Sequence, residues 1–231
     1  MKVDNWLTSL GHALLPPRCL VCRENGGNGV DLCPICLDSL PWNQTACDRC
    51  ALPLPTPGRC GQCLRRPPPL EATHAVFLYA APLDRLLPRL KFHRDLAAGR
   101  LLAGLMAASL AAQPRPDALV PVPLHRDRLR QRGYDQALEL ARPLARRLDL
   151  PLLPGALRRV RNTAPQSELD VHGRCRNLRG AFQAADAAKL PDHVALVDDV
   201  MTTGQTLHAA ATALRRAGVA RVDAWVCARV P

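Results

Sequence analysis

The chain has 231 residues, of which 48% are hydrophobic and only 3% aromatic, and its formal net charge is +11. This length can hold one full α/β domain and a small satellite, and leucine, alanine and valine must build the core because aromatic residues are few. The longest apolar stretch, residues 101–112, is too short to cross a bilayer, so the composition argues against a membrane span.

The first fifteen residues predict a short amphipathic helix around Trp6, Leu7, Leu10 and Leu14. Asp4 stands near the start and no continuous apolar run follows it, so the segment does not have the pattern of a secretory signal. We therefore expect a cytoplasmic protein, whose cysteines remain reduced.

Eight of the ten cysteines form four Cys-x-x-Cys pairs within the first 63 residues, and ten, ten and nine residues separate successive pairs. The pairs are Cys19/Cys22, Cys33/Cys36, Cys47/Cys50 and Cys60/Cys63. One such turn presents two thiolates to a tetrahedral zinc ion, and two turns complete a structural site. The pattern therefore predicts one or two structural zinc ions.

A disulfide framework and a redox-active Cys-x-x-Cys are the alternatives to zinc. No secretory signal precedes the cysteines, and no thioredoxin-like strand and helix surround them, so zinc is favoured. The spacing leaves the pairing open between a sequential arrangement, with two local ribbons, and a crossed one. Cys175 and Cys227 stand apart and are expected to be ordinary residues.

The positive charge belongs mainly to the second part of the chain. Residues 1–70 hold seven Lys/Arg and five Asp/Glu, which leaves +9 of the net charge to residues 71–231. A zinc ion with four thiolates adds about −2 in formal counting, so two zinc sites would make the first part negative. A basic second part favours polyanions, whether a pyrophosphorylated sugar or a nucleic acid.

Residues 64–70 contain three consecutive prolines, which favour polyproline II and predict a stiff boundary. We place one domain at 1–66 and the other at 67–231. The pattern then predicts a strand at 75–79, a leucine-rich helix at 83–90 perturbed by Pro88, a helix at 96–111, a strand at 118–123 and a helix at 135–148.

Four arginines lie in the segment 124–134, which we interpret as a loop beyond the end of a strand. They are Arg126, Arg128, Arg130 and Arg132. Guanidinium groups suit the oxygens of a pyrophosphate, whereas a single arginine would suggest only a solvated basic turn. His125 alone does not indicate a catalytic base, and His93, His172 and His193 have no partner visible in the sequence.

Residues 155–180 are rich in Arg, Asn, Gln and Ser and are interpreted as a mobile flap over a site. In an enzyme such a flap would exclude water from a reactive intermediate. A disordered linker is the alternative, but it fits less well because the segment has to join strands on both sides of the site.

The segment 194–206 carries the strongest functional signal in the chain. Four apolar residues predict a buried strand that ends at Asp198 and Asp199; a loop with Thr202, Thr203 and Gly204 follows, and then a helix at 206–214 closed by Gly218. A helix N-terminus attracts phosphate, and Gly204 lets the backbone approach it. The two carboxylates can accept hydrogen bonds from sugar hydroxyls, so the segment predicts a site for ribose 5-phosphate.

Two other interpretations of this segment compete with a site for ribose 5-phosphate. One is an ordinary strand, turn and helix in which Asp and Thr only cap the helix. The other is a nucleotide P-loop, which is disfavoured because the chain has no G-x-x-x-x-G-K-[ST].

The segment resembles the phosphoribosyl pyrophosphate (PRPP) signature of type I phosphoribosyltransferases. The chain as a whole resembles the ComF family, which includes GntX-like proteins, through an ordered series of features. These are the cysteine pairs, 90–92 (LKF), 120–124 (VPVPL), 132–136 (RGYDQ), 163–169 (TAPQSEL), Arg174, Asn177, 180–182 (GAF) and the signature. Tyr134 and Asp135 stand where Phe and Asn are usual in the family.

The resemblance implies an α/β fold, a type I phosphoribosyltransferase-like parallel sheet flanked by helices, preceded by a double zinc ribbon. It implies that Asp198 and Asp199 contact the ribose and are the catalytic acids. It assigns the phosphate to Val200, Met201, Thr202, Thr203, Gly204, Gln205 and Thr206, the pyrophosphate to Lys91, Arg126, Arg128, Arg132 and Gly133, and the flap to Gln166, Arg174 and Asn177.

Three functions follow from these expectations. The first is transfer of a phosphoribosyl group from Mg²⁺–PRPP to a nitrogenous acceptor that the sequence does not identify. The second, which the family name suggests, is the handling of single-stranded DNA together with DNA-uptake proteins. The third is a PRPP sensor without turnover. Nothing in the sequence indicates the oligomeric state.

Overall fold

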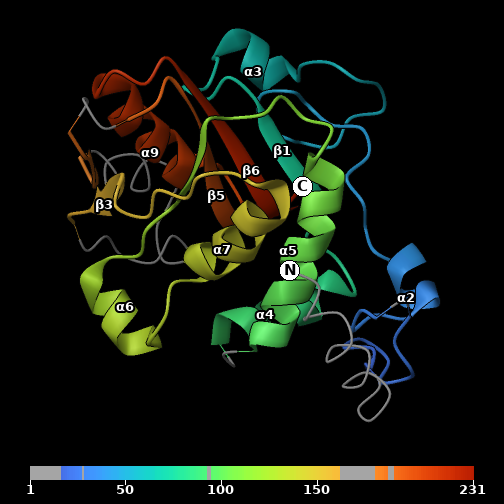
Figure 1. The fold of residues 1–231 in the computed structure, drawn as a ribbon. Helices are drawn as coiled ribbons and strands as arrows, with labels where there is room; N and C mark the ends of the chain where they lie inside the picture. The colour runs from blue at the N-terminus through green and yellow to red at the C-terminus, as the bar shows by residue number, and fades with distance from the viewer. Residues whose placement is uncertain (1–16, 28, 93–94, 162–179, 187–189) are drawn as a thin grey trace.

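The computed structural model describes residues 17–27, 29–92, 95–161, 180–186 and 190–231 (Figure 1). Four parallel strands form the central sheet, in the order β1-β6-β5-β2. They are β1 (Thr73–Leu78), β2 (Ala118–Pro121), β5 (His193–Met201) and β6 (Arg221–Arg229). Because all the pairs are parallel, the carboxyl ends of the strands meet at one edge of the sheet.

Both faces of the sheet are buried, as the apolar runs in its strands require. In β5, Ala195 and Val197 point into the core on one face, whereas Val194 and Leu196 point into the core on the other face. This alternation explains why the strand reads as a continuous hydrophobic segment rather than as apolar and polar residues in turn.

Three helices cover the first face: α4 (Leu83–Phe92), α5 (Leu96–Leu110) and α7 (Gln136–Leu148). Figure 1 shows α5 and α7 in front of β5 and β6. Asp95 and Asp135 begin α5 and α7, respectively, because their carboxylates accept hydrogen bonds from backbone N–H groups in the first turn. The opposite face is covered by α9 (Gln205–Arg216), which contributes Leu207, Ala210 and Leu214 to the second core.

A second, small sheet lies beside α9. It pairs β3 (Leu157–Arg159) with β4 (Phe182–Ala184) in antiparallel fashion. Leu157 and Phe182 join the core on the α9 side. The predicted flap residues Gln166, Arg174 and Asn177 fall in sequence between these strands and lie outside the described residues. The predicted N-terminal helix, Cys175, His93 and His172 also lie outside the described residues.

The cysteine-rich region packs against the rest of the chain through both cores. It contains the short helices α2 (Pro34–Asp38) and α3 (Gly61–Arg65). Leu32 and Leu40 join the core formed by α4 and α5, whereas Ala51 joins the core formed by α9. Leu70, at the end of the proline stretch, is fully buried, so this stretch is anchored where it enters the sheet domain.

The cysteine-rich region also covers the outer edge of β1. The N–H of Asn43 donates to the carbonyl of Val76 at 3.0 Å, and the N–H of Leu78 donates to the carbonyl of Pro41 at 2.7 Å. The ring of Trp42 packs on that of Phe77, with 4.6 Å between centroids. The sheet therefore does not end in a bare strand on this side.

The structure corrects two of the sequence expectations. The strand of the signature does not end at the carboxylates but continues to Met201, because β6 goes on pairing with it past Asp198. The segment 124–134 is not a loop throughout, since Arg126–Arg132 form helix α6. His125 caps this helix at its start, and Gly133, in the left-handed conformation with φ 79°, ends it. The other helices and strands that we predicted within the described residues are present, with shifts of a few residues at their ends.

Candidate functional site

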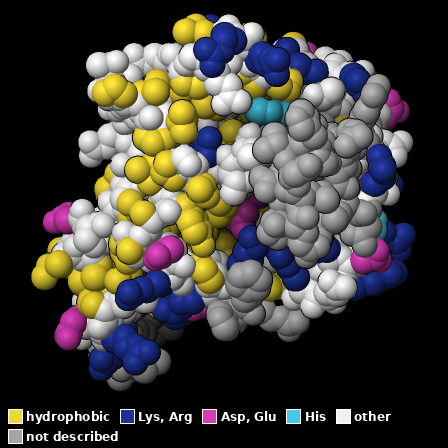
Figure 2. Space-filling model, turned by 180° about the vertical axis from the view of Figure 1, so that it is seen from behind, with side chains coloured by type: hydrophobic (Ala, Val, Ile, Leu, Met, Phe, Trp, Pro, Cys, Tyr) yellow, Lys and Arg dark blue, Asp and Glu magenta, His cyan; other side chains and the backbone are white. Residues whose placement is uncertain are grey.

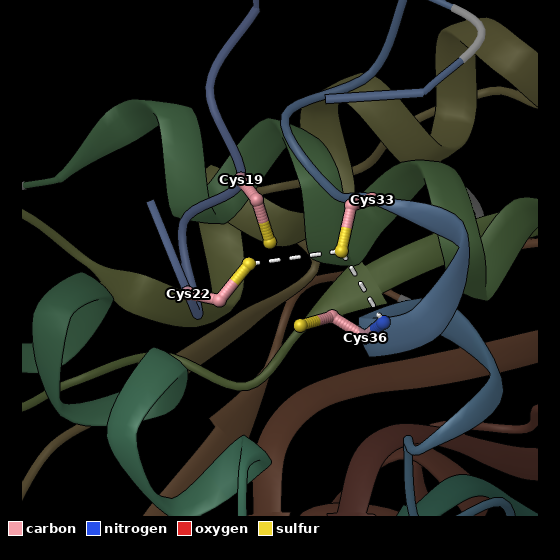
Figure 3. A group of neighbouring side chains, drawn as sticks. All are labelled: Cys19, Cys22, Cys33 and Cys36. Carbon is pink, nitrogen blue, oxygen red and sulfur yellow. Dashed lines mark hydrogen bonds between the residues drawn. The ribbon is translucent and has the colours of Figure 1, made fainter. Parts of the chain in front are cut away.

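The first four-cysteine set consists of Cys19, Cys22, Cys33 and Cys36. Figure 3 shows their sulfur atoms pointing toward one another. The four sulfur atoms lie within 4.8 Å of one another, and those of Cys22 and Cys33 are 3.7 Å apart. A tetrahedral zinc ion with Zn–S bonds of about 2.3 Å requires sulfur atoms about 3.8 Å apart. The set therefore fits zinc.

The second set consists of Cys47, Cys50, Cys60 and Cys63, whose sulfur atoms also lie within 4.8 Å of one another. The sulfur atoms of Cys50 and Cys60 are 3.7 Å apart. The sequential pairing is thus confirmed and the crossed one excluded. All nine cysteines in the described part of the chain are free, so the disulfide alternative is wrong for this structure.

Hydrogen bonds from backbone N–H groups lower the pKa of one cysteine in each set. Burial raises the pKa of Cys19, but hydrogen bonds from the backbone of Cys22, Cys33 and Val21 more than offset this and bring it to about 6. The pKa of Cys47 falls to about 7 for the same reason, with the backbone of Cys60 as the main donor. Since zinc binds thiolates, these donors favour the form that the metal needs.

The signature forms a small polar cavity between the end of β5 and the start of α9. The cavity has a volume of about 30 Å³ and is lined by Asp198, Val200, Met201, Thr202, Gly204, Gln205, Thr206 and Leu207. Gly204 adopts φ 77°, and a Cβ atom there would lie 2.4 Å from Cε of Met201. The position therefore requires glycine for its conformation and for space. Thr203 is exposed and does not line this cavity.

The two carboxylates lie side by side at the edge of the sheet. Oδ1 of Asp198 accepts from the N–H of Asp199 at 2.9 Å, and Oδ1 of Asp199 accepts from the N–H of Val200 at 2.8 Å. Burial raises the pKa of Asp198 well above its ordinary value, and the neighbouring charge of Asp199 raises it further. Cationic groups or a bound cation would stabilise the ionised pair.

An arginine on β3 interacts electrostatically with one of these acids. Burial lowers the pKa of Arg159, on β3, and the charge of Arg128, on α6, lowers it further, whereas the carboxylate of Asp198 raises it. Arg159 thus interacts both with Asp198 of the signature and with Arg128, one of the predicted pyrophosphate residues. No residue of α6 is buried, and Arg126 is exposed.

Lys91 and Arg132, two more of the predicted pyrophosphate residues, are linked through Gln136. Nη1 of Arg132 donates to Oε1 of Gln136 at 3.1 Å, and Nε2 of Gln136 donates to the carbonyl of Lys91 at 3.5 Å. Gln136 is only 3% exposed. The ends of α4 and α6 are thus held together at the start of α7.

Sequence reasoning missed two residues of this neighbourhood. Asp135 accepts from the N–H of Leu124 at 2.9 Å and from that of Leu138 at 3.2 Å, and so fixes the entry to α6 as well as the start of α7. Burial raises its pKa, and the charge of Asp199 adds to the effect. Arg159 was counted only as part of the basic flap region. The spacing of Asp135 before a helical pattern could have revealed the cap, but not its place near the signature.

The sequence also gave no partner for His193, and the structure supplies one. Nε2 of His193 lies 2.8 Å from Oδ2 of Asp223, and Arg221 donates to the same carboxylate at 3.0 Å. Asp223 is 1% exposed. These residues lie at the beginning of β5 and β6, at the opposite edge of the sheet from the signature, so they brace the strands.

Two family models match the chain. One, described as a double zinc ribbon domain, covers residues 10–64, and the other, described as a phosphoribosyl transferase domain, covers residues 135–231. Competence protein F of Haemophilus influenzae is 36% identical over 227 residues, which span 92% of this chain and 96% of the relative. The chain belongs to the ComF family.

Two further relatives agree with this assignment. The DNA utilization protein YhgH of Escherichia coli K12 is 35% identical over 230 residues, covering 93% of this chain and 98% of the relative. Competence protein ComFC of Bacillus subtilis is 28% identical over 156 residues, covering 65% of this chain and 61% of the relative. In this ComF protein the two four-cysteine sets are structural zinc sites of a double zinc ribbon.

Among the described helices, none has both the length and the apolar character needed to cross a bilayer.

Proposed function

We propose that this ComF protein binds Mg²⁺–PRPP at the carboxyl end of β5 and transfers its phosphoribosyl group to a nitrogenous acceptor. The observation that carries the proposal is the cavity of the signature at the N-terminus of α9, with Gly204 facing it. A phosphate there would meet backbone N–H groups and the positive end of the helix dipole. The 5-phosphate would occupy this cavity.

The remaining parts of PRPP have plausible partners at the same edge of the sheet. Asp198 and Asp199 offer acceptors for the ribose hydroxyls. Arg128 and Arg159 offer donors for the diphosphate, and the charge of Arg159 already interacts with those of Arg128 and Asp198. We also expect the bound ligand to contact Thr203, Arg126 and Gly133.

In the proposed reaction, the bond between ribose C1 and the pyrophosphate oxygen breaks and a bond from C1 to the acceptor nitrogen forms. Pyrophosphate leaves with the electron pair of the broken bond, and the acceptor loses one proton to solvent. Mg²⁺ on the diphosphate would offset charge on the leaving group. The residues of this chain would position PRPP and stabilise the departing charge rather than form a covalent intermediate.

The test is a calorimetric titration of the zinc-loaded protein with PRPP and Mg²⁺, followed by an assay of pyrophosphate release with a panel of bases. Replacing both acids, Asp198→Asn with Asp199→Asn, should weaken PRPP binding by about 2–5 kcal/mol, because two charge-assisted hydrogen bonds are lost. Asp192→Asn is the matched control, since Asp192 is exposed just before the opposite end of β5. Unchanged affinity in the double variant would refute the assignment of the acids.

Binding without pyrophosphate release for any base would instead support a PRPP sensor.

We propose a cytoplasmic location and a division into a zinc-ribbon domain at 1–66 and a phosphoribosyltransferase domain at 67–231. Limited proteolysis of the zinc-loaded protein would test this boundary.

The alternative function is the handling of single-stranded DNA, which the names of the relatives suggest, since they speak of competence and DNA utilization. The net charge of +11 is consistent with a polyanionic partner. On the face seen in Figure 2, however, the Lys and Arg side chains of the described residues lie at several separate places rather than in one stripe. On this face the described residues therefore form no continuous basic stripe.

Replacing Arg128, Arg130 and Arg132 with Ala distinguishes the two functions. If DNA and PRPP share the basic helix, both affinities fall and the dependence of DNA affinity on salt becomes less steep. If PRPP binding is lost while DNA affinity and its salt dependence stay at wild-type values, DNA must bind elsewhere.

A further inference from the structure

Arg229 connects the second four-cysteine set to residues 201–206, which join β5 to α9 and which we call the phosphate loop after the proposed function. It is the last residue of β6 and is only 9% exposed. Its Nε donates to the carbonyl of Cys50 at 3.0 Å, and its Nη1 donates to the carbonyl of Met201 at 3.3 Å and to that of Val230. One guanidinium group therefore bridges a cysteine of the zinc ribbon and the residue with which β5 ends.

Each end of this bridge lies at a residue that belongs to, or borders, a functional site. Cys50 belongs to the second set, and Ala51 beside it is 1% exposed in the core on the α9 side. Met201 opens the loop of the signature, and its side chain occupies the space next to Gly204. The carbonyl of Met201 also accepts from the N–H of Val230 at 2.9 Å, so the end of β6 supplies two donors to it.

The guanidinium contacts the second set through the carbonyl of Cys50. A zinc ion with four thiolates carries a formal charge of about −2, so the filled site remains an anionic neighbour for the guanidinium. Loss of the metal would remove the constraint on Cys50 and, with it, one anchor of Arg229.

The first set has a different attachment. Nη1 of Arg89, on α4, donates to the carbonyl of Leu20 at 2.7 Å, and Arg89 also pairs with Asp95 at the start of α5. These contacts lead to the helices on the other face of the sheet. The first set therefore serves as an internal control for any effect of the second.

We propose that Arg229 is a positioning residue that couples occupancy of the second zinc site to the shape of the phosphate loop. With zinc bound, Arg229 holds the carbonyl of Met201 and the loop keeps the form that receives a phosphate. Without this zinc, the loop loosens and binds its ligand more weakly. The part of the proposal that concerns PRPP rests on the proposed function; the effect on the loop does not.

Hydrogen exchange on the full chain tests the effect on the loop without any ligand. Backbone amides of 202–206 should exchange faster in the Cys60→Ser, Cys63→Ser variant than in wild type, and at the wild-type rate in the matched Cys33→Ser, Cys36→Ser variant. In Arg229→Met, these amides should exchange faster even with zinc bound, and Arg229→Lys should restore part of the protection. Equal exchange in the two cysteine variants, or wild-type exchange in Arg229→Met, would overturn the proposal.

The same coupling can be measured from the metal side in wild-type protein, which avoids variants that fold poorly. Coupling between two sites is reciprocal for equilibrium affinities, so PRPP should raise the affinity of one of the two zinc ions by about fivefold or more, measured by equilibrium competition with a chelator, and leave the other unaffected. Arg229→Met should abolish the difference. If PRPP binds and neither zinc is protected, the coupling is refuted. If PRPP does not bind at all, the proposed function fails, and hydrogen exchange alone decides the role of Arg229.

Discussion

Replacing Gly204 with alanine tests whether the phosphate loop depends on close backbone packing. Gly204 has φ 77°, and a left-handed conformation costs an alanine about 1–2 kcal/mol relative to glycine. The new Cβ would also lie 2.4 Å from Cε of Met201 and 3.1 Å from Nε2 of His208. Met201 is only 2% exposed, so moving its methyl group should cost about 1–2 kcal/mol more.

Gly180→Ala is the matched control for this variant. Gly180 has φ 68°, close to that of Gly204, but no atom of the described residues lies within 4 Å of the position of its Cβ. Urea unfolding should therefore show Gly204→Ala less stable than wild type by about 2–4 kcal/mol and Gly180→Ala by only about 1–2 kcal/mol. Equal losses in the two variants would show that the contact with Met201 exerts no constraint, and the reasoning about the loop would be wrong.

Three further predictions concern stability and metal content. Burial, together with the charge of Arg229, lowers the pKa of His208 to about 4. As pH falls from about 6.5 to 4, the unfolded chain therefore binds a proton that the folded chain does not, and the folded state loses stability. His208→Asn should recover on the order of 2–3 kcal/mol of this loss, as measured by urea unfolding at each pH. Asp135→Ala should cost about 1–3 kcal/mol at pH 7, because the N–H groups of Leu124 and Leu138 both lose their acceptor, and Asp135→Asn should cost less. Metal analysis of freshly reduced protein should find about two zinc ions per chain, and finding none would contradict the role given to both cysteine sets.

The sequence predicted features that depend on local pattern. The cysteine spacing predicted one or two zinc sites but left their pairing open, and the run of four apolar residues at 194–197 together with the composition of 206–214 located β5 and the helix after it. Helix α6 was interpreted as a loop because its seven residues are nearly all polar and none is buried, so they carry no hydrophobic period. Pairing of His193 with Asp223 joins residues 30 positions apart, and contact between Arg229 and Cys50 joins residues 179 positions apart. Such contacts depend on the tertiary fold, so no local pattern could reveal them.

The segment 41–43 that lies along β1 has a consequence for any attempt to study the sheet domain alone. A chain that begins after this segment would leave the N–H of Leu78 and the carbonyl of Val76 without their partners, and would expose Phe77, which is fully buried in the intact protein. An unpaired edge strand with an apolar side chain is a template for pairing with a second molecule. We therefore expect the zinc ribbon to prevent self-association of the sheet domain, and its removal should yield aggregates rather than a simpler monomer.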